Sequence, residues 1–137
     1  MSGLDQLMRL QRWTLDEKRR QASDLELLIE RLVQDIIKLD EQVEREIEAS
    51  RNNIDMQRAL PGYRQAMSTR RERLDKSLID LRGELEKLRE QITEAFSELK
   101  KTEQTVKNRH QRQRLAERRK EQAVSDEVGL QLHRRKG

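Results

Sequence analysis

The stretch "RALPGYRQAM", residues 58–67, contains the only proline of this 137-residue chain and one of its five glycines. On both sides of it the sequence is dense in Leu, Glu, Arg, Lys and Gln, which are good helix formers. A proline has no backbone donor and is disfavoured inside a helix, but it suits the first position of one. The stretch therefore predicts a break between two long helices.

Both flanking segments carry residues at alternating steps of three and four, mostly apolar, which is the pattern of a coiled-coil seam. The first seam runs through Leu4, Met8, Gln11, Leu15, Lys18, Ala22, Leu25, Ile29, Leu32, Ile36, Leu39 and Val43. After one extra step of four, which a stutter explains, it continues through Ile47, Ser50 and Ile54. The second runs through Met67, Arg71, Leu74, Leu78, Leu81, Leu85, Leu88, Ile92, Ala95, Leu99, Thr102 and Val106. An antiparallel fold about Leu60–Pro61 pairs Leu15 with Val106, Ala22 with Leu99, Ile29 with Ile92, Ile36 with Leu85, Val43 with Leu78 and Ile54 with Met67.

The predicted fold is all-α, a long antiparallel two-helix coiled-coil hairpin. Helix one is expected over about residues 3–56, the tip over about 57–61 and helix two over about 62–126, with residues 127–137 as a tail whose order the sequence leaves open. The composition agrees, because 41% charged, 33% hydrophobic and 2% aromatic residues leave little material for a broad core. No apolar run reaches the roughly 18 residues of a membrane span, so no membrane insertion is expected.

The sequence lacks the patterns that usually carry catalysis or cofactor binding. Neither GxxxxGK[ST] nor GxGxxG occurs, and the chain has no cysteine. Its two histidines, His110 and His133, have no carboxylates at metal-ligand spacing. The acidic residues lie at helix-surface spacings beside Lys and Arg, as solvated pairs do. We therefore expect no enzyme, no catalytic residue, no cofactor and no metal.

Charge is unevenly distributed along the chain. Residues 21–50 hold nine acidic and three basic side chains, whereas residues 100–137 hold five acidic and twelve basic ones. The basic excess gathers in "KNRHQRQRLAERRKEQ", residues 107–122. An acidic protein surface, a solvated helix face and nucleic acid are all possible explanations. Nucleic acid is disfavoured, because no aromatic residues are interleaved for stacking. In addition, Glu117 and Glu121 interrupt the run, and Glu103 lies just before it.

Some apolar residues fall outside the seam. Helical spacing turns Leu10 and Trp13 outward and places Leu7 beside the seam, with Leu115 outward on helix two. This group is either a binding anchor or a frayed end whose side chains tuck back locally. Val33 and Ile37 flank the seam and are expected to widen it. At the tip, Tyr63 either caps the turn or contacts a partner.

"LPGYRQAMSTRRERLDKSL", residues 60–78, and "RKEQAVSDEVGLQLHRRK", residues 119–136, carry a resemblance. In a charged helical hairpin of this length, they resemble the flagellar export protein family FliJ. Its counterpart in virulence type III secretion is the YscO family of stalk proteins. Because much of the pattern is common to coiled coils, the basic-Glu-Gln run from Arg119 to Gln122, followed by Asp126 and Glu127, is its most distinctive part.

The resemblance implies a hairpin similar to the stalk helices of the rotary ATPase γ subunit. Such a protein binds and stimulates the hexameric export ATPase through its open end, contacts the cytoplasmic domain of the export gate and escorts export chaperones. It would be a monomer when free, cytoplasmic, peripherally associated with the inner-membrane export apparatus and without nucleic acid. The implied ATPase contacts are Leu7, Leu10, Trp13, Arg112, Arg118, Arg119 and Lys120, and the implied gate contacts are Met56, Tyr63 and Arg70. The alternative is a structural coiled-coil spacer, or a basic rod that binds another protein or nucleic acid.

Overall fold

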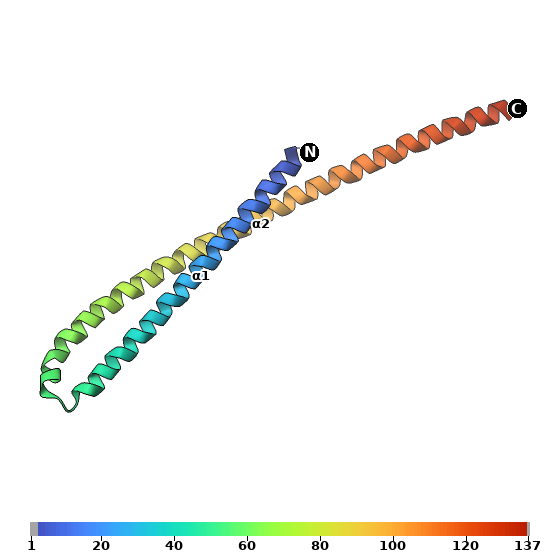
Figure 1. The fold of residues 1–137 in the computed structure, drawn as a ribbon. Helices are drawn as coiled ribbons and strands as arrows, with labels where there is room; N and C mark the ends of the chain where they lie inside the picture. Colours follow the sequence, from blue (N-terminus) through green and yellow to red (C-terminus); the bar gives the residue numbers. More distant parts are fainter. Residues whose placement is uncertain (1–2, 137) are drawn as a thin grey trace. The chain divides into compact units, whose positions relative to one another are not determined.

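A computed structural model describes residues 3–136, which form two helices and, within that range, no strand. Helix α1 runs Gly3–Ser50 and α2 runs Ile54–Lys136 (Figure 1). The chain divides into two compact units. We call Leu15–Glu94 the hairpin unit, since it holds the turn and the parts of both helices next to it. The residues up to Thr14 together with those from Ala95 onward form the terminal unit. The predicted all-α, two-helix fold is confirmed.

The predicted seam is confirmed for both helices. Every seam residue from Leu4 to Ser50, and every one from Met67 to Val106, is buried or half-buried. In the hairpin unit, Ala22, Leu85 and Leu88 form a buried cluster against which Leu25, Ile29 and Ile92 pack. Ile54 is the exception, because it is the first residue of α2 and is 69% exposed. Its predicted pairing with Met67 is therefore wrong.

The turn lies at residues 51–53, so the predicted tip at about 57–61 is wrong. Asn53 caps α2, since its Oδ1 accepts hydrogen bonds from the backbone N–H groups of Asp55 and Met56, at 3.1 and 3.2 Å. The side chain of Gln57 donates to the carbonyl of Arg51 at 2.9 Å and ties the first turn of α2 to the end of α1. Ser50 Oγ donates to the Ile47 carbonyl at 2.7 Å. These contacts fix the chain reversal ahead of the proline.

Pro61 lies inside α2, not at the first position of a helix as predicted. Helix one thus ends at Ser50 instead of about 56, and helix two begins at Ile54 instead of about 62. The proline cannot donate a hydrogen bond to the Gln57 carbonyl, which weakens the helix there. Continuing the helix through it places Leu60 and Tyr63 in half-buried positions, where they extend the seam.

The C-terminal segment, whose order the sequence left open, is also helical. Helix α2 includes residues 127–136, while Gly137 lies outside the described residues. The last turn carries His133, Arg134, Arg135 and Lys136. Positive charge at a helix C-terminus interacts favourably with the helix dipole. The basic residues of the last turn therefore support a helix as far as Lys136.

The helices pair in a register that differs from the predicted one. Ala22 was predicted to face Leu99 but packs with Leu85 and Leu88, and Leu88 lies about 11 residues, or three turns, earlier in α2. The step of three from Ala22 to Leu25 is matched by the step of three from Leu88 to Leu85. The predicted pairs set that step against the step of four from Leu99 to Ala95. Matched steps keep facing side chains level along both helices, which explains the observed choice.

We expect a pair of introduced cysteines to report this register directly, since the chain contains no cysteine of its own. Ala22→Cys with Leu88→Cys should form a disulfide under mild oxidation, because both positions belong to one buried cluster. The measurement is the shift of the oxidised chain on a non-reducing gel. Ile36→Cys with Leu85→Cys, the predicted pair, is the control. Ile36 lies about 20 Å further along α1 than Ala22, so efficient crosslinking of the control pair would contradict the observed register.

Gln11 is a weak point of the seam in the terminal unit. Its Oε1 atom is buried and has no hydrogen-bond partner among the described residues. A buried acceptor without a partner costs about 1–3 kcal/mol. We therefore expect Gln11→Leu to raise the free energy of unfolding by about 1 kcal/mol or more in chemical denaturation. Gln6→Leu is the control, because Gln6 is exposed. An equal gain from both variants would mean that the buried oxygen is not the cause.

Candidate partner-binding site

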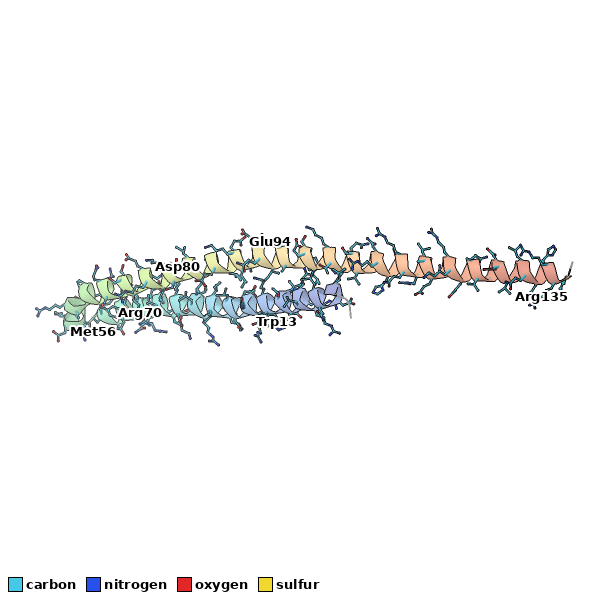
Figure 2. All side chains as sticks on the ribbon, turned by 90° about the horizontal axis from the view of Figure 1, so that it is seen from above. Trp13, Met56, Arg70, Asp80, Glu94 and Arg135 are labelled. Carbon is cyan, nitrogen blue, oxygen red and sulfur yellow. The ribbon has the colours of Figure 1, made fainter. Side chains whose placement is uncertain are left out.

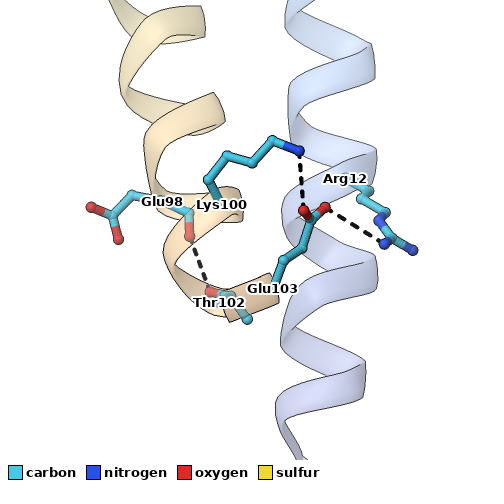
Figure 3. Close-up of polar contacts among 5 residues, drawn as sticks. All are labelled: Arg12, Glu98, Lys100, Thr102 and Glu103. Carbon is cyan, nitrogen blue, oxygen red and sulfur yellow. Dashed lines mark hydrogen bonds and ion pairs between the residues drawn. The ribbon is translucent and has the colours of Figure 1, made fainter. Parts of the chain in front are cut away.

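In the terminal unit, the first residues of α1 pack along α2. Leu4, Asp5, Val106, Arg109, His110 and Gln113 line a shallow hollow where the two helices meet. Further along, the guanidinium of Arg12 lies 3.6 Å from the carboxylate of Glu103 (Figure 3). These contacts fix which part of α2 the start of α1 covers.

Glu103 is held as a carboxylate by its surroundings. Lys100 Nζ donates a hydrogen bond to it at 3.1 Å, and this bond lowers the pKa of the Glu103 carboxyl below its ordinary value. The charge of Arg12 acts in the same direction, while partial desolvation opposes it. Lys100 also lies over the ring of Phe96, 5.3 Å from its centroid. These surroundings favour the charged form of Glu103, the form that attracts Arg12.

Leu7, Leu10 and Trp13 form an exposed apolar group on α1, as the sequence predicted. They are 42%, 59% and 63% exposed. Trp13 lies on the side of α1 that faces away from α2 (Figure 2). None of the three tucks back against the helix pair, so the frayed-end interpretation does not hold. Leu115 of α2 is also outward, at 50% exposure. Exposed apolar groups of this size on charged helices are typical of contact sites.

The rest of α2 forms a second feature, which we call the basic segment, residues 107–136. Every residue in it is exposed. It contains ten Lys or Arg and four Asp or Glu residues, a net charge of +6. None of these ten basic side chains forms an ion pair with any residue that the structure describes. Four of the predicted contacts, Arg112, Arg118, Arg119 and Lys120, belong to it.

The structure separates Trp13 from the basic contacts Arg118, Arg119 and Lys120. Arg12, next to Trp13, pairs with Glu103, and Arg118 follows Glu103 by 15 residues, about 22 Å along the helix axis. In the predicted register, Trp13 faced Asn108, only ten residues from Arg118. A partner that contacts both Trp13 and Arg118 must therefore span this distance along the terminal unit.

A family model for the flagellar FliJ protein matches residues 1–137, which is the whole chain. The chain belongs to the flagellar FliJ family. It is therefore a non-catalytic component of the flagellar protein-export apparatus. The resemblance inferred from residues 60–78 and 119–136 is confirmed. No curated protein and no solved structure matches the sequence.

At the tip of this FliJ-family chain, two of the three predicted gate contacts are partly covered. Met56 and Tyr63 are half-buried, and they line a hollow together with Glu46, Ser50, Ala59 and Leu60. The Tyr63 hydroxyl is buried and has no hydrogen-bond partner among the described residues. Arg70 is exposed. Sequence reasoning missed that Tyr63 is a seam residue, although the step of four from Tyr63 to Met67 continues the seam pattern.

Next to the tip, the FliJ-family chain has a groove between its helices. Leu39, Val43 and Met67 supply apolar side chains, and Asp40, Glu44, Arg64, Ser68 and Arg71 complete the lining. Arg71 pairs with Asp40 and with Asp75, and the hydrogen bond to Asp40 raises the pKa of the guanidinium further. The groove thus offers an apolar floor with acidic residues from α1 and basic residues from α2.

Neither helix contains a segment long and apolar enough to cross a membrane, as far as residues 3–136 show. Across the same range, no three His, Cys, Asp or Glu side chains gather closely enough to hold a metal ion.

Proposed function

We propose that the protein is the stalk component of the flagellar export apparatus, which binds the hexameric export ATPase through its terminal unit and stimulates ATP hydrolysis. The observation that carries the proposal is the basic segment, with its ten basic side chains and no internal ion pairs. A helix that exposes this much uncompensated charge is suited to an acidic protein surface. Family membership supports the same assignment.

The apolar group supplies the second contact of the proposed ATPase interface. Leu7, Leu10 and Trp13 would be buried against the partner, and this burial slows dissociation. The basic segment attracts the partner over a longer range. We assign the binding site for the cytoplasmic domain of the export gate to the tip, around Met56, Tyr63 and Arg70. The groove beside the tip supports a helix-binding role for this end of the hairpin unit. Export chaperones are further proposed partners.

The test is the ATP hydrolysis rate of the cognate export ATPase with and without the full-length protein. We expect a clear rise that is lost on deletion of residues 1–14 or of residues 110–137. An unchanged rate at saturating protein, without co-elution, would favour a structural coiled-coil spacer. The gate and chaperone assignments are tested by the same co-elution with those partners in place of the ATPase.

Trp13→Ala is expected to weaken ATPase binding about tenfold without loss of helix, because a buried aromatic anchor typically contributes 1–2 kcal/mol or more. Titration calorimetry gives the affinity, and far-UV circular dichroism gives the helix content. Leu27→Ala is the matched control, since Leu27 is 54% exposed on the same helix but belongs to the hairpin unit. Equal affinities of the two variants would remove Trp13 as an anchor.

A further inference from the structure

One flank of the hairpin unit carries a partly open stripe on α1. It follows the same three–four spacing as the seam, one position over, and we call it the flank stripe: Glu26, Glu30, Val33, Ile37, Asp40 and Glu44. Two contacts to α2 mark its position. Glu26 lies 3.4 Å from Arg89, and Asp40 pairs with Arg71. Midway between these two contacts the stripe is apolar.

The apolar centre of the flank stripe is open. Val33 is half-buried and Ile37 is 43% exposed. Seven residues before Arg89 on α2, Arg82 occupies the position that corresponds to Val33, and it has no ion pair with a described residue. An acidic residue at position 33 could pair with Arg82, between the Glu26–Arg89 and Asp40–Arg71 pairs. The chain has Val33 there instead. The sequence prediction that Val33 and Ile37 only widen the seam accounts for Val33 but leaves Ile37 uncovered.

Acidic side chains surround this apolar centre. The flank stripe contains four carboxylates and no base. Two of them, Glu30 and Glu44, form no ion pair with any residue in the described range. A ligand for this surface must therefore present positive charge together with apolar side chains on a stiff, elongated body.

The basic segment of the same chain has this chemistry. Its ten basic side chains form no ion pair with a described residue. Val124, Val128 and Leu132 follow one another at steps of four with 63%, 48% and 52% exposure. Its 30 residues span about 45 Å, more than the about 27 Å from Glu26 to Glu44. Each copy of the protein thus carries two helical surfaces of complementary charge.

We propose that the basic segment of one copy docks along the flank stripe of a second copy. Lysines and arginines contact Glu30 and Glu44, and the valine–leucine row covers Val33 and Ile37. The contact is largely electrostatic, so it depends on ionic strength. It also occupies basic residues that the proposed function assigns to the ATPase, so self-association and ATPase binding compete. The monomer expected from the sequence is then the high-salt state.

The test is sedimentation velocity of the full-length protein over a range of concentrations at low and at high salt. We expect a mass that rises above 16.4 kDa with concentration at low salt and returns to the single chain at high salt. Glu30→Lys with Glu44→Lys should abolish the association, and so should Arg118→Glu with Arg119→Glu. An equimolar mixture of these two double variants should restore it, because each then offers the charge that the other needs.

Asp80→Lys with Glu84→Lys is the control, since both residues are exposed on α2 outside the flank stripe and change the net charge equally. The control should associate like the unaltered chain. A single-chain mass under all conditions would overturn the proposal. So would association that survives in either double variant, or a mixture that fails to associate. None of these readouts requires the ATPase, so they are independent of the proposed function.

Discussion

Leu85→Asp is expected to unfold the hairpin unit at ordinary temperatures. Leu85 is only 6% exposed and packs in one cluster with Ala22 and Leu88. Removal of a buried leucine side chain typically costs 2–5 kcal/mol, and a carboxylate buried without a partner adds to this. A total loss of about 4 kcal/mol or more is a large part of the 5–15 kcal/mol that holds most domains together. Far-UV circular dichroism and thermal denaturation measure the effect.

Ile79→Asp makes the same chemical change on the same helix at a position that is 70% exposed. It should leave helix content and melting temperature nearly unchanged. If Leu85→Asp retained full helicity and cooperative melting, the packing of the Ala22 cluster would be contradicted. Similar losses in both variants would show that the helices are sensitive to any added acid.

Reversal of three charges in the basic segment should reduce ATPase binding about a hundredfold. The change is Arg118→Glu, Arg119→Glu and Lys120→Glu, all at exposed positions without ion pairs among the described residues. At about 1 kcal/mol for each reversed contact, three reversals amount to about 3 kcal/mol. The measurement is the protein concentration that gives half-maximal stimulation of ATP hydrolysis, at several salt concentrations.

The matched control reverses Arg73, Lys76 and Lys87, three exposed basic residues of the hairpin unit. It changes the net charge equally and should retain stimulation. The unaltered protein should also lose affinity as salt rises, whereas the reversed variant should respond less. Equal losses in both triple variants would mean that the partner senses net charge instead of the basic segment.

Some of the candidate site followed from single helices and could be predicted. The outward positions of Leu10 and Trp13 depend only on 3.6 residues per turn and on which neighbours lie in the seam. Their distance from Arg118 depends on the register between the two helices. The register predicted from the sequence differs from the observed one by about three helical turns. The half-buried position of Tyr63 was missed for the same reason, because it requires the turn to precede the proline.

The sequence by itself determined the helices, the seam and the uneven charge, because these are properties of spacing and composition along one chain. It did not determine the register or the turn. A repeating seam can close in several registers, and a proline marks a weak point in a helix without requiring the chain to reverse there. Tertiary structure decided both, through the cap at Asn53, the link from Gln57 to Arg51 and the packing of Ala22 with Leu88. The residues in these contacts become neighbours only when the chain reverses and the two helices pack together.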